Sequence, residues 1–221
     1  MRRTPGYILI VVVLAATAFG QPPTIPVTPA PAPDGKPERT VLVYLPQQLY
    51  SGDEFEPALR QLSLAGVKTR IATADTGVAV SMTQVLVRPD LTLLDSKVGD
   101  YDGFVLIGGS GAALHWDDSL LHARCREFVE SGRVVAAIGI APITLARAGL
   151  LKGRKATVFH ERNAIEWLRQ AGARFSFRDL VVDRNVITAA SAEQARAFGR
   201  TIARIVQEAR AAPQAGRRTA N

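Results

Sequence analysis

Short apolar runs alternate with segments of helical spacing along most of this 221-residue chain, and this alternation constrains the fold more than any other feature. Such runs are typical of strands buried on both faces. We expect strands at 40–45, 67–72, 104–107, 134–138, 156–159, 180–183 and 186–188, and helices at 53–65, 119–130, 143–148, 164–170 and 192–211. Because strand, helix and strand follow one another from the start, the sequence predicts an α/β fold, a three-layer α/β/α sandwich with a mostly parallel sheet. Residues 78–94 predict an extended hairpin or excursion.

The two ends of the chain differ from the segment between them. Two arginines precede an apolar run over 8–20, which is a pattern typical of an export signal. The apolar run is too short for a comfortable membrane span. The expected organisation is as follows: 1–20 a signal peptide or N-terminal anchor, 21–38 a proline-rich linker, 39–211 the domain, 212–221 a flexible tail. We therefore expect an exported protein, periplasmic or secreted, that meets a membrane only through an uncleaved N-terminal segment.

The formal net charge of +7 does not by itself predict a nucleic-acid partner. The positive residues are scattered, and no aromatic-interleaved basic helix or nucleic-acid motif is found, so we expect no nucleic acid. Lys152, Arg154 and Lys155 form a basic group able to contact anionic polymers. The single cysteine, Cys125, shares a helical face with Phe128, which predicts a buried thiol rather than a reactive one.

Gly139 lies at the apex of a strand-to-helix turn, between the run 134–138 and a helix with Pro142 in its first turn. In α/β hydrolases such a turn displays the nucleophile above the carboxyl ends of the strands. Glycine keeps the turn and lacks the reactive side chain. The simpler interpretation is a plain tight turn. Because glycine supplies no nucleophilic side chain, this position argues against covalent catalysis.

A second glycine turn, Gly108-Gly109-Ser110, follows the predicted strand 104–107. Glycines at a strand end let a ligand approach the main chain, and their N–H groups can form an anion nest or an oxyanion hole. We take these three residues as candidate ligand-binding positions, against the simpler interpretation of an ordinary turn. The segment matches neither a dinucleotide fingerprint nor a P-loop, and no cofactor is expected.

His115, Asp117, Asp118 and His122 offer a metal-site interpretation, because their spacing permits it. The two aspartates also suit the amino terminus of the predicted helix 119–130. We favour the helix start, and we expect no metal.

Four segments of the chain carry a family resemblance in their order and spacing. They are YDGFVLIGG at 101–109, AAIGIAP at 136–142, LARAGLLKGRKAT at 145–157 and VDRNVIT at 182–188. Together they resemble the ThiJ/PfpI family of the class I glutamine amidotransferase-like superfamily over nearly all of 40–206. The resemblance implies a flavodoxin-like sheet, and it implies a cysteine at the turn beside a glutamate from the first βα loop. Its members include peptidases, deglycase or glyoxalase-like enzymes, chaperones, isonitrile hydratases and regulatory domains.

This chain departs from the family pattern at the turn. The family's nucleophile position is Gly139, and the position that commonly holds histidine is Ile140. Counting back from Gly66 places the acidic partner at Glu54, and His160 lies near a position where some relatives carry an active-site histidine. Glu54 also suits an ordinary acidic first turn of a helix, and His160 a polar residue at a strand end.

Two functions follow from these positions. The leading hypothesis is an exported, non-catalytic domain that binds a small ligand or a protein partner at a degenerate pocket of Glu54, Gly139, Ile140 and His160. The alternative is a cysteine-independent hydrolase or lyase in which Glu54 activates water, His160 assists and the Gly108–Gly109 amides form an oxyanion hole. The resemblance also raises the expectation of a homodimer, because family members often dimerise.

Overall fold

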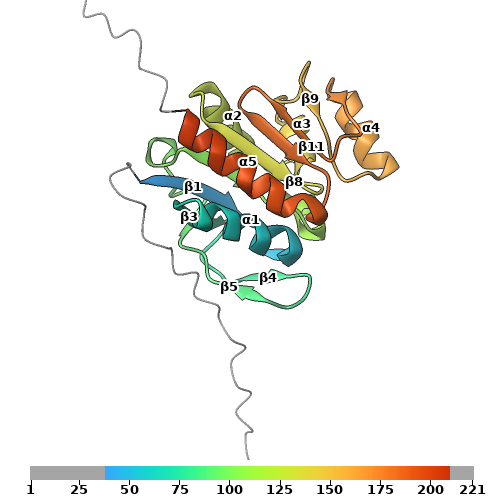
Figure 1. Cartoon of the computed structure of the whole chain (residues 1–221). Helices are drawn as coiled ribbons and strands as arrows, with labels where there is room; N and C mark the ends of the chain where they lie inside the picture. The colour runs from blue at the N-terminus through green and yellow to red at the C-terminus, as the bar shows by residue number, and fades with distance from the viewer. Residues whose placement is uncertain (1–37, 210–221) are drawn as a thin grey trace, which may run out of the picture.

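A seven-stranded sheet forms the centre of the fold, seen in a computed structural model that describes residues 38–209 (Figure 1). Its strand order is β11-β12-β8-β7-β1-β3-β6, and neighbours are parallel except for the antiparallel pair β11 and β12. The strands are β1 (Arg39–Tyr44), β3 (Val67–Thr73), β6 (Leu91–Thr92), β7 (Gly103–Leu106), β8 (Val134–Ile138), β11 (Leu180–Asp183) and β12 (Val186–Ala189). The predicted mostly parallel sheet is confirmed.

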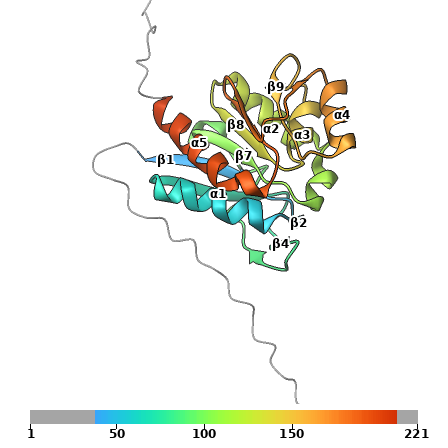
Figure 2. The ribbon, with the colours of Figure 1, turned by 45° about the vertical axis from the view of Figure 1, so that its right-hand side comes forward.

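Helices cover both faces of this sheet, which gives the three layers predicted from the sequence (Figures 1 and 2). One face packs against α1 (Gly52–Leu64) and α5 (Ala195–Glu208). The other face packs against α2 (Ser119–Glu130) and α3 (Pro142–Arg147), and α4 (Arg162–Gln170) packs against α3 and β10 and adds to the same core. Each face therefore has its own apolar core.

β1 shows why the apolar runs of the main sheet do not alternate apolar and polar residues. Val41 and Val43 point into the core under α1 and α5, whereas Leu42 and Tyr44 point into the core under α2. All four are at most 2% exposed. Because successive side chains of a strand point to opposite faces, a strand covered on both faces must be apolar throughout.

The helices begin at the capping residues that the sequence supplies. The Ser51 hydroxyl accepts the Glu54 N–H at 3.3 Å at the start of α1, and Asp118 Oδ1 accepts the Leu121 N–H at 2.9 Å at the start of α2. Asp118 therefore has the helix-start role that was favoured over metal binding. The Cys125 side chain is fully buried in α2, which confirms the predicted buried thiol, and burial raises its pKa.

Smaller elements surround the main sheet. They are β2 (Gln48–Tyr50), β4 (Ala79–Ser81) and β5 (Leu86–Val87) in a three-stranded sheet, β9 (Lys155–Ala156) and β10 (Arg174–Phe175) in a two-stranded one, and the 3₁₀ helices η1 (Val98–Asp100), η2 (Ser110–His115) and η3 (Ala192–Gln194). The excursion predicted over 78–94 contains the β4–β5 hairpin and then β6, which joins the edge of the main sheet.

Two predicted elements differ from the structure. The strand expected at 156–159 is wrong beyond Ala156, because Phe159 donates its N–H to the Gly139 carbonyl at 2.8 Å instead of continuing a ladder. The closing helix begins at Ala195 after the short η3 turn, rather than at 192. The first change depends on the distant Gly139 carbonyl, which local pattern does not reveal, and the second on a local 3₁₀ turn closed by the Gln194 N–H and the Ser191 carbonyl.

The predictions for 1–20, 21–37 and 212–221 lie outside the described residues, as does the end of the predicted domain after 209. Within 38–209, the structure contains no helix that is long and apolar enough to cross a membrane.

Candidate functional site

The carboxyl group of Glu54 is the centre of the site at the carboxyl ends of the strands. Glu54 is the third residue of α1, and the start of that helix is tied to β7 because Ser51 donates its N–H to the Gly108 carbonyl at 3.1 Å. In return, Gly108 donates its N–H to Glu54 Oε2 at 2.8 Å. Glu54 is only 6% exposed. The glutamate chosen from the sequence therefore lies beside the Gly108-Gly109-Ser110 turn.

Gly139 lies directly below this carboxyl group. It follows β8 with φ +66°, a backbone conformation that side chains other than glycine's rarely adopt. A Cβ added at Gly139 would overlap Glu54 Oε1 and lie 2.9 Å from the carboxyl carbon. The Glu54 carboxyl thus fills the space in which a side chain on the turn would begin.

Gly108 is confined in the same way. A Cβ added there would lie 2.7 Å from Glu54 Oε2, 2.8 Å from the Ile138 carbonyl and 3.2 Å from the Ile140 nitrogen. These distances place Gly108, Gly139, Ile140 and Glu54 in one small volume. Among the described residues, no hydrogen bond is formed by the Ile140 N–H, which leaves one backbone donor at this turn.

Burial changes the acidity of Glu54. Removal of the carboxyl from water raises its pKa from 4.5 to about 7, the Gly108 N–H acts in the opposite direction, and the Asp53 carboxylate adds a smaller upward effect. Near neutral pH the group therefore exchanges between a protonated donor and an ionised acceptor. A carboxyl with this property is suited to proton transfer or to binding a polar group.

The second half of the glycine turn has a packing role. Gly109 has φ +96°, and a Cβ there would overlap the Leu49 carbonyl and the Ser51 nitrogen. The glycine thus allows the chain before α1 to approach the end of β7 closely. Ser110 is exposed and begins η2. Only Gly108 of these three candidate residues contacts Glu54 through a hydrogen bond.

The His160 side chain contacts Thr157 and two phenylalanines. Its Nε2 shares a hydrogen bond of 3.3 Å with the Thr157 hydroxyl, and its ring packs edge-on against Phe175 and Phe177 with centroids 6.0 and 5.9 Å away. Within 38–209, no hydrogen bond joins His160 to Glu54. Because Phe159 donates to the Gly139 carbonyl, this aromatic group borders the turn without supplying a side chain to the carboxyl.

The four residues of the metal interpretation are engaged separately. Asp118 caps α2 and lies 3.8 Å from His115 Nδ1, Asp117 pairs with Arg147, and His122 Nε2 hydrogen-bonds to the Trp116 carbonyl at 2.7 Å. In the described part of the chain, no group of three or more His, Cys, Asp or Glu side chains is arranged to hold a metal ion.

A polar pair that the sequence pattern did not indicate lies next to η2. The Tyr44 hydroxyl hydrogen-bonds to His115 Nδ1 at 3.1 Å, and the two rings pack edge-on. Burial raises the pKa of Tyr44 and lowers the pKa of His115, so both are neutral at neutral pH. A tyrosine at the end of an otherwise apolar strand was the one signal in the sequence.

The layers and the buried acid at the strand ends define a flavodoxin-like α/β sandwich with its site at the carboxyl edge of the sheet. Residues 39–205 match the model of the DJ-1/PfpI family, and the chain belongs to that family. The resemblance stated from the sequence is thereby confirmed.

Known relatives show the same relationship. An uncharacterized protein of Methanocaldococcus jannaschii is 35% identical over 171 residues, covering 77% of this chain and 83% of the relative. The deglycase PfpI of Pyrococcus furiosus is 29% identical over 144 residues, covering 62% and 85% of the two chains. A crystal structure of a ThiJ/PfpI domain protein from Brachyspira murdochii superposes with TM-score 0.74 at 21% identity, covering 78% of this chain and 99% of that one.

Proposed function

We propose that this chain is an exported, non-catalytic DJ-1/PfpI domain that binds a small polar ligand at the pocket of Glu54, Gly139 and Ile140. The observation that carries the proposal is the position of the Glu54 carboxyl, which fills the space above Gly139. Covalent catalysis needs a nucleophilic side chain at the turn, and this chain offers glycine and isoleucine there.

The groups that remain can still recognise a ligand. The Glu54 carboxyl accepts or donates a hydrogen bond according to its protonation, because burial brings its pKa to about 7. The Ile140 N–H adds a donor, and the half-buried Ile140 side chain adds an apolar wall. These features favour a small ligand with a polar end over a large protein partner.

A screen of small carbonyl, carboxylic and amino compounds tests this proposal by thermal shift of the full chain. Hits should stabilise the wild type and lose that effect in Glu54→Gln, while the exposed neighbour variant Glu56→Gln keeps it. A deglycase assay should show no turnover above buffer in any of the three. Turnover by the wild type that Glu54→Gln abolishes would overturn the non-catalytic assignment.

That outcome would support the cysteine-independent hydrolase or lyase. The raised pKa of Glu54 favours it, since general acid-base catalysis works best near the operating pH. Two observations weigh against it. The Gly108 N–H assigned to the oxyanion hole already donates to Glu54, and His160 contacts Thr157 and phenylalanines instead.

Export remains part of the proposal and rests on the pattern of residues 1–20. Fractionation of cells that express the full chain should place it outside the cytoplasm, and replacing Arg2 and Arg3 by glutamate should retain it inside. We also propose that the chain forms a homodimer and binds no nucleic acid, and these proposals, like export, rest on the sequence alone. Light scattering at several protein concentrations, with and without duplex DNA, measures both.

A further inference from the structure

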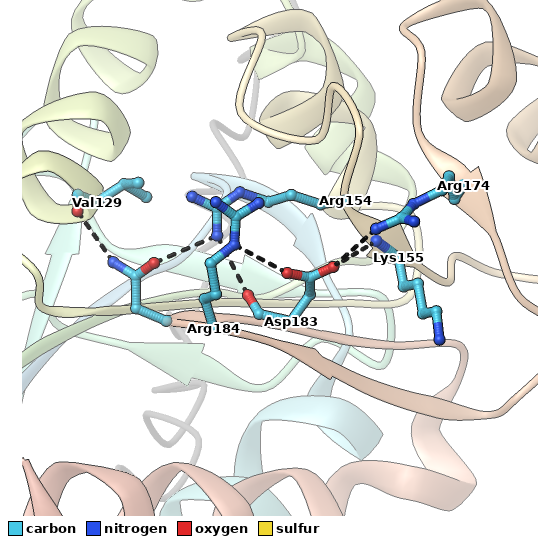
Figure 3. A network of polar contacts seen from close by, with 7 residues as sticks. Val129, Arg154, Lys155, Arg174, Asp183 and Arg184 are labelled. Carbon is cyan, nitrogen blue, oxygen red and sulfur yellow. Dashed lines mark hydrogen bonds and ion pairs between the residues drawn. The ribbon is translucent and has the colours of Figure 1, made fainter.

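Three arginine side chains gather around Asp183 at the end of the sheet opposite Glu54 (Figure 3). We define the basic cluster as Arg154, Lys155, Arg174 and Arg184: the three arginine side chains contact Asp183, whereas Lys155 contacts it through its backbone N–H. The register of β12 on β8 pairs Val186 with Val135, so the turn before β12 lies at the amino end of β8. Gly139 follows the other end, and the two sites are therefore distinct.

Three segments that are far apart in the sequence build this cluster. β9 and β10 pair in parallel with Lys155 opposite Arg174, and Lys155 donates its N–H to Asp183 Oδ2 at 2.7 Å. Arg154 Nη1 donates to the Asp183 carbonyl at 3.2 Å and to Asn185 Oδ1 at 3.3 Å. Asn185 Nδ2 donates to the Val129 and Arg133 carbonyls, both at 2.9 Å, which fixes the turn between β11 and β12.

The charges in this cluster are not balanced. Asp183 Oδ1 accepts from Arg184 Nε at 3.1 Å, and Arg174 lies 4.0 Å from Oδ2. Among residues 38–209, these are the only ion pairs that the cluster forms, so Arg154 and Lys155 have no ion-pair partner there. The side chains of Arg174 and Arg184 are 65% and 66% exposed, whereas that of Asp183 is 14% exposed. Guanidinium N–H groups are left facing solvent.

The pKa shifts of Asp183 and Arg154 agree with an excess of positive charge in the basic cluster. The pKa of Asp183 is lowered, first by the Lys155 N–H and then by the Arg184 guanidinium, so the carboxylate stays ionised. The pKa of Arg154 is lowered by burial and by the neighbouring Arg184 charge. A second anion at this place would relieve repulsion that Asp183 alone does not neutralise.

We propose that the basic cluster binds a phosphate group. Arginine presents its N–H donors in a fork that matches phosphate oxygens, and the exposed guanidinium groups of Arg174 and Arg184 present such donors to solvent on either side of Asp183. A polymer would instead be followed by a long basic stripe, which the scattered charges elsewhere do not provide. The proposal rests on the cluster alone and is independent of Glu54.

Titration of the full chain with inorganic phosphate, followed by amide NMR shifts at constant ionic strength, tests this proposal. We expect saturable shifts around 152–155, 174 and 183–185, which sodium chloride does not reproduce. The double variant Arg174→Gln/Arg184→Gln should bind at least about ten-fold more weakly, equivalent to about 1.4 kcal/mol. The control Arg204→Gln removes an arginine of similar exposure, 58%, from α5 and should bind like the wild type. Equal shifts with chloride, or unchanged affinity in the double variant, would overturn the proposal.

A second variant guards against loss of structure in the first. The Arg174 side chain is 65% exposed and lies 4.0 Å from Asp183 Oδ2, so Arg174→Gln removes one charge and breaks no side-chain hydrogen bond in the described part of the chain. It should weaken phosphate binding about three-fold with an unchanged circular dichroism spectrum, and undiminished affinity would count against the proposal. Co-sedimentation with phosphatidylglycerol vesicles, but not phosphatidylcholine vesicles, would assign the phosphate to a lipid headgroup if the same variants abolish it. Phosphate binding without co-sedimentation would assign it to a free phosphate or phosphate ester.

Discussion

The two ends of the sheet each hold one carboxylic acid, and their surroundings have opposite effects on it. Glu54 and Asp183 both accept one backbone N–H, from Gly108 at 2.8 Å and from Lys155 at 2.7 Å. Glu54 is buried without a cation, and its pKa rises to about 7. Asp183 lies among arginines, and its pKa falls below 3.8.

The comparison teaches that a single backbone hydrogen bond does not decide the charge of a carboxyl. Loss of water outweighs that bond at Glu54, while the arginines reinforce it at Asp183. One end of the sheet thus holds a group that can change its protonation at neutral pH. The other end holds a permanent anion with surplus positive charge.

The largest effect is expected of Gly139→Cys, which places a cysteine where the sequence resemblance expects one. The new side chain needs the φ of +66° and the space of Glu54 Oε1. We expect a loss of about 3–4 kcal/mol in the free energy of unfolding, measured by urea denaturation, from backbone strain and overpacking.

Gly149→Ala supplies the control for that change. Gly149 has φ +79°, and a Cβ there meets nothing within 4 Å, so only the backbone cost of about 1 kcal/mol should be seen. If both variants lose the same stability, the Glu54 carboxyl does not occupy the space above Gly139.

The pH dependence of stability should differ between wild type and Glu54→Gln. Because the folded pKa of about 7 exceeds the unfolded value of 4.5, the native state holds the extra proton between these values. The contribution of Glu54 is fully present below pH 4.5 and is lost as pH rises through 7, by about 3 kcal/mol at most. Urea denaturation at pH 5 and pH 8 measures this loss, which the glutamine variant should lack and Glu56→Gln should retain.

Asp183→Asn should show the opposite pH dependence with a smaller amplitude. A lowered pKa means that the contribution is present above pH 3.8 and disappears as pH falls through the folded value. Partial exposure to solvent limits it to about 0.5–1 kcal/mol at pH 7 and low salt. Thermal unfolding of the wild type and Asp183→Asn at pH 7 and pH 3 measures this contribution. If the two proteins differ in stability by the same amount at both pH values, the charge of the Asp183 carboxylate does not contribute to stability.

Lys155→Gln should change stability least, by less than about 0.5 kcal/mol, since its backbone makes the contact that matters to the fold. Thermal unfolding of the full chain is again the measure. A larger loss would mean that the ammonium group itself stabilises this end of the sheet, contrary to the surplus of charge inferred from the contacts.

The fold could be predicted from the sequence because its signals are local. The run 134–138 is apolar without alternation, as a strand covered by helices on both faces must be. Asp118 precedes its helix as a cap, and Cys125 falls on the apolar face of that helix. The strand expected to reach 159 failed because the Phe159 N–H finds the distant Gly139 carbonyl.

The sequence predicted which residues belong to the candidate site, but not which of their side chains contact one another. Counting back from Gly66 selected Glu54, and the turn pattern selected Gly139. His160 was grouped with them, yet its hydrogen bond goes to Thr157. A position in the sequence does not state the direction of a side chain, and Tyr44 with His115 was missed for the same reason.

The sequence by itself determined that this chain builds a layered α/β domain and that its turn carries no nucleophile, because both depend on residue type and short-range periodicity. Only the tertiary structure decided that Glu54 fills the space above Gly139 and that arginines from separate segments meet at Asp183. The pKa of Glu54 follows from its burial, which outweighs the N–H of Gly108, a residue 54 positions away, and the pKa of Asp183 follows first from the N–H of Lys155, 28 positions away. Burial and charge act through space, and a linear sequence does not specify distance in space.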